Sequence, residues 1–270
     1  MSPILNHTRV TAGQTEPERW LYLLHGIYGS GRNWGSLARR LVDERPGWGV
    51  ILVDLRLHGG SQGFAPPHTV EACAEDVAQL QESLGIAATA ILGHSFGGKV
   101  ALLTAAAATP SPESLWVIDS TLTTGGPEGT AWEVIEIVRS LPDSFASRDE
   151  VADAFEARGY ARGVGQWLAM NLEREGERFT WRLDWEGVEQ MLRDYFATDV
   201  WQIVEDPPEG VELHVMKASR SQAVDDEVEA RIRAAADRTG RVDLHVVEGG
   251  HWLNVDNPEG VLAVLLEELP

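Results

Sequence analysis

The pentapeptide Gly93-His94-Ser95-Phe96-Gly97 places a serine between two glycines. An apolar run, Ala90–Leu92, precedes it, and a helical pattern, Lys99–Ala108, follows it. A strand, a tight turn and a helix in this order expose the serine hydroxyl at the end of the strand and direct the positive end of the helix dipole toward it. The pattern therefore predicts that Ser95 is the nucleophile in an acyl transfer.

A serine nucleophile needs a general base, and His251 is the histidine best placed to serve as one. The segment Gly249-Gly250-His251-Trp252 follows a predicted strand, Val242–Glu248, and its small residues allow the histidine ring to approach Ser95. The other histidines fit less well, since they lie in strand patterns, in loops without matching partners or beside the nucleophile: His245, His214, His7, His68 and His94.

Attack by Ser95 creates an oxyanion, which needs two preorganised hydrogen-bond donors. The expected pair is the backbone N–H of Phe96 and that of Ile27, in the loop after the apolar run Trp20–Leu24. Gly26 allows that loop to approach the site closely. His25 is expected to bond loop backbone, with no direct part in the chemistry.

Short apolar runs alternate with helical patterns on either side of these residues. The predicted strands are Trp20–His25, Val50–Asp54, Thr89–Gly93, Leu115–Asp119, Val211–Lys217 and Val242–Glu248. The predicted helices are Ser36–Glu44, Val70–Leu84, Gly97–Ala108, Glu227–Thr239 and Pro258–Leu269. This alternation is typical of an α/β protein with a mostly parallel sheet and helices on both faces.

Residues 122–206 break the alternation and are predicted to form a cap (lid) on a core made of residues 1–121 and 207–270. Pro207-Pro208 marks the return to the core. Helical patterns cover Ala131–Ser140, Asp149–Arg158, Val164–Glu175 and Trp185–Phe196, and Arg178–Leu183 has the alternation of a short strand. Five of the ten tryptophans fall in this segment: Trp132, Trp167, Trp181, Trp185 and Trp201. They suit either an apolar substrate pocket or the core of the cap.

The acid that orients the base is less clear from the sequence. One expected place for it is the loop after the strand Val211–Lys217, but no carboxylate stands there, and Ser221 takes its place. Asp119 ends the neighbouring strand at the same edge of the sheet and is the preferred candidate. Asp225 and Asp226, at the start of a predicted helix, are the alternatives.

Composition narrows the function classes. The net charge of −20 disfavours nucleic acid or an anionic membrane as the partner. The single cysteine, Cys73, excludes an intrachain disulfide and is expected to be buried. No apolar run reaches the length of a membrane span, and Met1–Val10 does not have the pattern of a signal peptide, so the expected location is cytoplasmic.

Four segments together resemble the α/β-hydrolase superfamily: Leu24–Ser30, Asp54–Ser61, Gly93–Lys99 and Gly249–Trp252. The Asp-x-Arg-x-His-Gly-x-Ser segment and the Gly-Gly-Lys after the nucleophile are similar to YbfF-type bacterial esterases and their eukaryotic abhydrolase relatives. The resemblance implies the α/β-hydrolase fold, with a helical lid inserted after the sixth strand. It implies Asp119 as the acid and Ser221 as a neighbour that bonds it. Asp54, Arg56 and His58 are expected to be structural.

These expectations together describe a serine hydrolase that cleaves small to medium carboxylic esters through an acyl-enzyme. Tyr28 and Trp252 are candidates for the substrate pocket, although Tyr28 fits a packing role equally well. No metal or organic cofactor is implied, and the expected partner is a small acyl ester bound by a monomer or homodimer. Thioester, lactone or C–C bond hydrolysis, perhydrolysis and a lyase step remain alternatives on the same residues. A non-catalytic ligand-binding protein is the alternative from another class.

Overall fold

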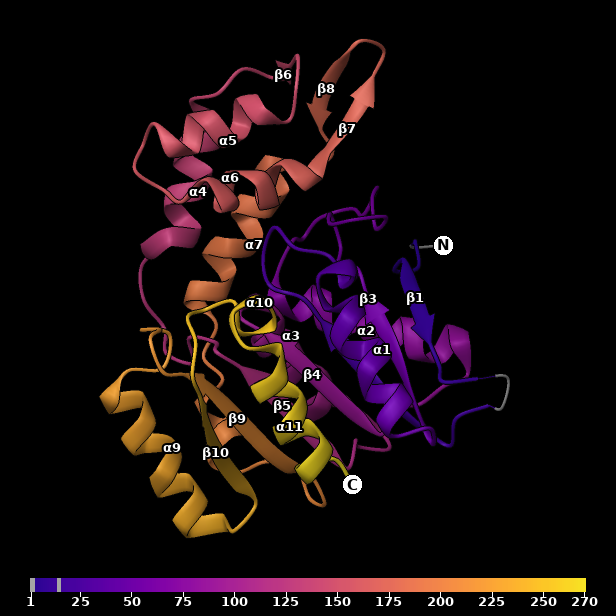
Figure 1. The fold of residues 1–270 in the computed structure, drawn as a ribbon. Coiled ribbons are helices and arrows are strands. Elements are labelled where there is room, and N and C mark those ends of the chain that lie inside the picture. The colour runs from indigo at the N-terminus through magenta and orange to yellow at the C-terminus, as the bar shows by residue number, and fades with distance from the viewer. Residues whose placement is uncertain (1–2, 14–15) are drawn as a thin grey trace.

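A computed structural model describes residues 3–13 and 16–270 of the chain. Within these residues, seven strands form one sheet in the order β1-β3-β2-β4-β5-β9-β10 (Figure 1). Only β1 runs antiparallel to its neighbour. The bounds are β1 (His7–Val10), β2 (Arg19–Leu24), β3 (Trp48–Val53), β4 (Ala90–His94), β5 (Ser114–Ile118), β9 (Glu212–Ala218) and β10 (Val242–Val247).

Helices cover both faces of this sheet, as the apolar runs of its central strands predict. Tyr22 and Leu24 of β2 pack into one core, and Leu21 and Leu23 pack into the other. The first core is covered by α2 (Val70–Leu84), α3 (Phe96–Ala107), α8 (Trp201–Glu205) and α9 (Asp226–Thr239). The second is covered by α1 (Gly35–Glu44) and α11 (Pro258–Glu268). The prediction of an α/β sheet with helices on both faces is confirmed.

The strand register brings four chain segments to one edge of the sheet. His94 at the end of β4 is paired with Ile118 at the end of β5, and Ile118 is paired with Met216 of β9. Ala218 at the end of β9 is in turn paired with Val247 of β10. The residues that directly follow these strands therefore share a single edge.

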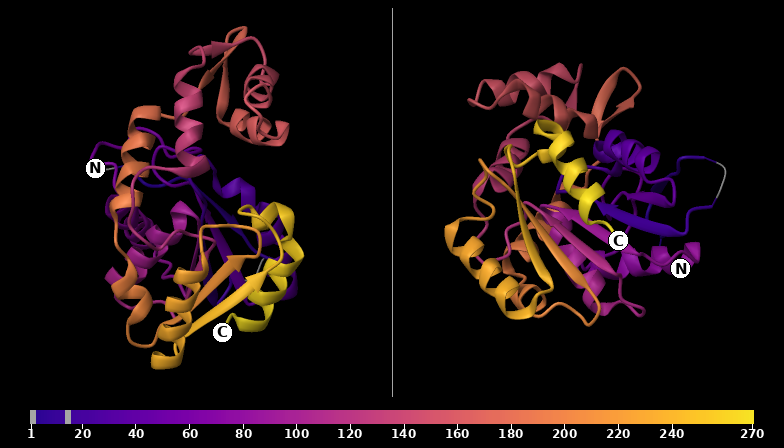
Figure 2. Two further views of the ribbon diagram at one scale, coloured as in Figure 1. Left: turned by 90° about the vertical axis from the view of Figure 1, so that its left-hand side faces the viewer. Right: turned by 60° about the horizontal axis from the view of Figure 1, so that its bottom comes forward.

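The chain between β5 and β9 forms a lobe over this edge of the sheet (Figures 1 and 2). We call residues 122–206 the cap. It contains α4 (Gly129–Arg139), α5 (Asp149–Glu156), α6 (Arg162–Leu168), a 3-10 turn (Ala169–Asn171) and α7 (Trp185–Ala197), and it ends with α8. A small antiparallel sheet, β6-β8-β7, joins β6 (Ser144–Phe145), β7 (Leu172–Glu175) and β8 (Arg178–Trp181).

Several expectations about the cap need correction. It is not purely helical, because it carries the β6-β8-β7 sheet. The expected helix Val164–Glu175 ends at Leu168, and its last four residues form β7 instead, since they pair with β8 across a turn at Gly176. The cap follows β5, the fifth strand of the described chain and not the sixth.

The state of the single cysteine and the character of the helices can also be read from the structure. Cys73 is buried within α2, as expected, and burial raises the pKa of its thiol. Across residues 3–13 and 16–270, none of the helices combines the length and the apolar character needed to cross a membrane.

Candidate active site

Ser95 lies in the tight turn between β4 and α3. Its backbone angles are φ 53° and ψ −119°, in the positive-φ region that residues other than glycine rarely adopt. Two glycines make the turn sterically feasible: a Cβ on Gly93 would lie 1.9 Å from the carbonyl oxygen of Gly97, and one on Gly97 would lie 2.6 Å from that of Leu24. The turn therefore holds Ser95 at the amino end of α3 in a strained, fixed conformation.

His251 lies in the loop between β10 and α10 (Leu253–Asp256) and faces Ser95. Its Nε2 is 3.0 Å from Ser95 Oγ, and its Nδ1 is 2.7 Å from Asp119 Oδ2. The loop is held in place by His94, whose Nε2 lies 2.7 Å from the carbonyl oxygen of His251. Burial lowers the pKa of His94 to about 3, so this ring is neutral and can donate to that carbonyl.

Asp119 directly follows β5 and is fully buried. Its backbone N–H donates to Met216 O at 2.8 Å, and its Oδ1 accepts a hydrogen bond from Ala218 N–H at 3.0 Å. Burial alone would raise the pKa of the carboxyl group, but hydrogen bonds from His251, Ser221 and Ala218 outweigh it, and the pKa falls below its usual value. Asp119 is therefore a carboxylate with one oxygen directed at His251.

The two alternative acids have other roles in the structure. Asp225 is the N-cap of α9, where its Oδ1 accepts from Val228 N–H at 2.9 Å, and Asp226 is in the first turn of that helix. Of the candidate acids, the structure brings only Asp119 to His251.

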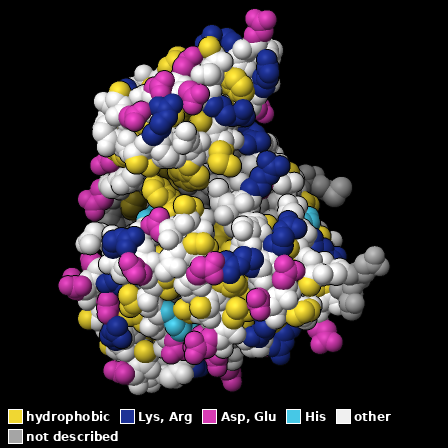
Figure 3. Space-filling model, in the orientation of Figure 1, with side chains coloured by type: hydrophobic (Ala, Val, Ile, Leu, Met, Phe, Trp, Pro, Cys, Tyr) yellow, Lys and Arg dark blue, Asp and Glu magenta, His cyan; other side chains and the backbone are white. Residues whose placement is uncertain are grey.

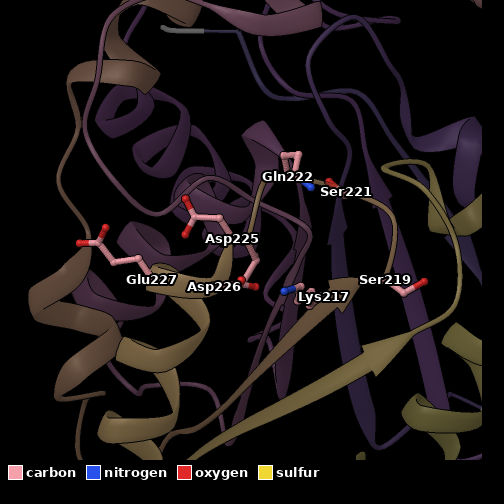
Figure 4. A pocket seen from close by; sticks show the side chains of 8 residues that line it. Lys217, Ser219, Ser221, Gln222, Asp225, Asp226 and Glu227 are labelled. Atoms are coloured by element: carbon pink, nitrogen blue, oxygen red, sulfur yellow. The ribbon is translucent and has the colours of Figure 1, made fainter.

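Ser221 borders both Asp119 and an open cavity of about 450 Å³ at the ends of β9 and α9. Figure 4 shows the lining side chains, which are mostly polar. Neither Ser95 nor His251 lines this cavity. Ser221 therefore stands between the buried acid and a polar surface depression, at the position where the sequence lacks a carboxylate.

The loop after β2 is fixed by His25 and His58. Leu55 N–H donates to His25 Nε2 at 3.0 Å, so the ring proton is on Nδ1, which donates to Gly26 O at 2.7 Å. In the same way, Tyr28 N–H donates to His58 Nε2 at 3.0 Å. Burial lowers the pKa of both rings, that of His58 to about 3, so both remain neutral.

Two backbone N–H groups near Ser95 have no hydrogen-bond acceptor among the described residues. Gly26 approaches the nucleophile closely, since a Cβ there would lie 3.2 Å from Ser95 Cβ. Within the described part of the chain, neither Ile27 N–H nor Phe96 N–H donates a hydrogen bond. Phe96 is the first residue of α3, where N–H groups lack partners within the helix.

The segment Asp54–Ser61 packs against the loop after β2 and bonds to its backbone. Asp54 accepts hydrogen bonds from Gly31 N–H, Gly60 N–H and the Asn6 amide at 2.7–2.9 Å. Arg56 forms a buried bidentate ion pair with Asp76, at 2.6 and 2.9 Å. All of these partners lie outside the cap. The contacts suit the structural role expected of Asp54, Arg56 and His58.

The two candidate pocket residues, Tyr28 and Trp252, belong to a series of aromatic contacts between the core and the cap. The Trp252 ring is 5.7 Å from that of Trp167, and Trp167 and Trp185 of the cap lie 6.3 and 5.7 Å from the Tyr28 ring. Figure 3 shows hydrophobic side chains gathered in the hollow between the two lobes. Aromatic side chains of the core and the cap therefore meet beside His251, whose ring is 6.1 Å from that of Trp252.

Lys99 has a role that the sequence did not reveal. It lies one turn into α3, is fully buried, and donates to the carbonyl oxygens of Thr123, Tyr195 and Thr198 at 3.1, 2.8 and 2.7 Å. Two of these carbonyls are at the carboxyl end of α7, where a cation is favourable. The sequence signals were the Gly-Gly-Lys segment after the nucleophile and a lysine within an otherwise apolar helix pattern.

Comparisons with known proteins agree on the family and the fold of the chain. The family model described as "Alpha/beta hydrolase family" matches residues 21–264. The sn-1-specific diacylglycerol lipase ABHD11 of Mus musculus is 32% identical over 246 residues, which cover 88% of this chain and 77% of that protein. Esterase YbfF of Escherichia coli is 26% identical, with 97% of both chains covered. The solved structure of a marine microorganism esterase matches with a TM-score of 0.84 and 26% identity, and covers 98% of this chain and 99% of that one.

Proposed function

Because this chain belongs to the alpha/beta hydrolase family, we propose that it hydrolyses carboxylic esters with Ser95 as nucleophile, His251 as general base and Asp119 as the supporting acid. The observation that carries the proposal is the pair of contacts at His251, 3.0 Å to Ser95 Oγ and 2.7 Å to Asp119 Oδ2. A histidine between a serine and a carboxylate at these distances can take up the serine proton.

In the proposed reaction, Asp119 accepts a hydrogen bond from His251 Nδ1–H, which keeps the ring proton on Nδ1 and leaves Nε2 as the proton acceptor. Ser95 Oγ attacks the ester carbonyl while its proton moves to Nε2, which gives a tetrahedral intermediate. The intermediate collapses to an acyl-enzyme, and the Nε2 proton passes to the leaving alcohol. Water then attacks the acyl group while its proton moves to His251 Nε2. The second tetrahedral intermediate collapses as Nε2 returns this proton to Ser95 Oγ, which releases the acid product and regenerates the enzyme.

The negative oxygen of the intermediate is bound by the N–H groups of Ile27 and Phe96 in this proposal. The carbonyl of Gly26 is held by His25 Nδ1–H at 2.7 Å and by Gly29 N–H at 3.0 Å. The C=O and N–H of a trans peptide point in opposite directions. Fixing the carbonyl of Gly26 therefore fixes the direction of Ile27 N–H without using that donor.

An apolar acyl group suits the aromatic border of the site, and small to medium acyl esters are the proposed substrates. The relatives support the ester class, since one is an esterase and another is a diacylglycerol lipase. The aromatic rings of Tyr28 and Trp252 are the proposed wall residues on the core side. An acyl chain between them and the cap tryptophans would exchange contact with water for contact with apolar surface.

The test is turnover of p-nitrophenyl acetate and butyrate by the parent and by Ser95→Ala. We expect the variant to lose at least 10³-fold in kcat, since no nucleophile remains. Ser83→Ala is the matched control, because that hydroxyl bonds only Leu80 O within α2 and should leave kcat unchanged. A fluorophosphonate should add one phosphonyl group to the parent and none to Ser95→Ala. Equal turnover by Ser95→Ala and the parent would refute the proposal.

A further inference from the structure

One side chain of the cap bonds directly to the loop that carries Ile27. Asn171 ends the 3-10 turn before β7 and is 4% exposed. Its Nδ2 donates to Tyr28 O at 2.8 Å and to Leu168 O at 3.2 Å. The backbone carbonyl oxygen of Asn171 accepts a hydrogen bond from Arg182 N–H at 3.0 Å. Both the backbone and the side chain of Asn171 are therefore held.

Tyr28 is the residue next to Ile27, and its conformation depends on its partners. Its φ is 64°, a value that is unfavourable for a bulky residue and that persists only where surrounding contacts impose it. Its backbone N–H donates to His58 Nε2 outside the cap, and its hydroxyl donates to Ala131 O of the cap at 2.5 Å. Its carbonyl accepts from Asn171, so two of these three bonds come from the cap.

The cap therefore contacts the loop that carries Ile27 and Tyr28, which we call the oxyanion loop. It does so through a buried hydrogen bond as well as through aromatic packing. If Asn171 and Tyr28 separated, the buried carbonyl of Tyr28 would lose its donor from Asn171. The hydrogen-bonded arrangement is therefore favoured. That arrangement fixes the Tyr28–Gly29 peptide group, whose N–H donates to Gly26 O at 3.0 Å, while His58 holds the Ile27–Tyr28 peptide group. Ile27 N–H is one residue away, close enough that rotation of the loop would turn this donor away from Ser95.

We propose that Asn171 is a positioning residue that holds the oxyanion loop from the cap and so aligns Ile27 N–H with the substrate oxygen. The proposal rests on the proposed function, since it assigns Asn171 to the step in which negative charge develops on that oxygen. Donors aligned in advance lower the barrier of this step and have little effect on the uncharged ester in the ground state. Loss of the alignment should therefore appear in kcat, with KM changed little.

The experiment replaces Asn171 with leucine, which has a similar volume and no donor. For p-nitrophenyl butyrate we expect kcat to fall by about tenfold to a hundredfold, which is less than the 10²–10³ cost of removing a donor outright. KM should stay within about threefold. A trifluoromethyl ketone forms a hemiketal oxyanion on the serine, so its inhibition constant should rise by the same factor as kcat falls.

The matched control is Arg148→Met. Arg148 holds the same turn of the cap through Ala169 O at 3.2 Å and Leu172 O at 2.7 Å, and its hydrogen bonds among the described residues do not include Tyr28. If Asn171 acted only by stabilising the turn, the two variants would lose kcat equally. We expect kcat of Arg148→Met to stay within about twofold of the parent.

Asn171→Asp is the second variant, for use if the leucine variant does not fold. It keeps the side-chain volume and replaces the donor with acceptors, so the same loss of kcat is expected. Unchanged kcat, a loss confined to KM, or equal losses in the control would overturn the role of Asn171. An inactive parent would instead refute the proposed function, so the two failures can be distinguished.

Discussion

Replacement of Asp119 by asparagine tests the part of the site that the sequence left most open. In the structure, one oxygen of Asp119 faces His251 Nδ1 at 2.7 Å and the other faces Ala218 N–H at 3.0 Å. An asparagine of the same shape has one acceptor and one donor for these two partners. Because a backbone N–H cannot accept, the asparagine must turn its oxygen to Ala218 and its NH₂ to His251.

This orientation reverses the tautomer of the base. An NH₂ directed at Nδ1 requires that nitrogen to accept, so the ring proton moves to Nε2, the nitrogen 3.0 Å from Ser95 Oγ. A protonated Nε2 cannot take the serine proton. The equivalent change in a Ser-His-Asp protease lowers kcat by about 10⁴, which corresponds to about 5 kcal/mol of transition-state stabilisation. We expect a loss of about 10³ to 10⁴ here, with KM within a few-fold of the parent.

The assay is steady-state hydrolysis of p-nitrophenyl butyrate, with the thermal midpoint of each variant measured in parallel. Asp225→Asn is the matched control, because asparagine caps a helix as well as aspartate does and Asp225 accepts a hydrogen bond from Val228 N–H of α9. The control should keep both kcat and the thermal midpoint. The reasoning is refuted if Asp119→Asn retains more than about a tenth of kcat, or if Asp225→Asn loses more activity than Asp119→Asn at unchanged fold.

Two further outcomes follow from Lys99 and Ser221. Lys99→Met should lower the free energy of unfolding in urea by about 2 kcal/mol at pH 7, because three carbonyls lose their shared donor. Burial lowers the pKa of Lys99 to about 8, so from pH 8 to 10 the folded chain releases a proton that the unfolded chain keeps. The free energy of unfolding of the parent should therefore rise relative to that of Lys99→Met over this range, and a constant difference would contradict a buried charge. Ser221→Ala should lower kcat less than tenfold, since His251 and Ala218 still bond Asp119, and a hundredfold loss would show that the hydroxyl is essential.

The sequence predicted those parts of the fold that depend on local pattern. The strand before Ser95 and the helix after it follow from apolar runs and spacing, and the predicted helix Val70–Leu84 matches α2 exactly because Thr69 caps its start and Gly85 its end. The order of the strands in space is not a local property. Pairing of β5 with β9 is what brings Ala218 to Asp119, and no pattern within either strand encodes that contact.

The cap was predicted less well, for related reasons. The expected helix Val164–Glu175 failed because cross-strand pairing of Leu172 with Trp181 overrides the helical pattern, and Gly176, with φ 62°, provides the turn. Asn171 gave no signal, since its partner is a backbone carbonyl more than a hundred residues away. Contacts between a polar side chain and distant backbone leave no periodic trace in a sequence.

The three carbonyls on Lys99 have a consequence for how such a protein can change over evolutionary time. Thr123 is at the entrance to the cap and Thr198 is close to its exit, yet both bond a single ammonium group. The chain therefore enters the cap and returns from it at neighbouring points, both beside Lys99. We therefore expect a different segment to be accepted between these two points without a change in the order of the sheet strands that carry Ser95 and Asp119.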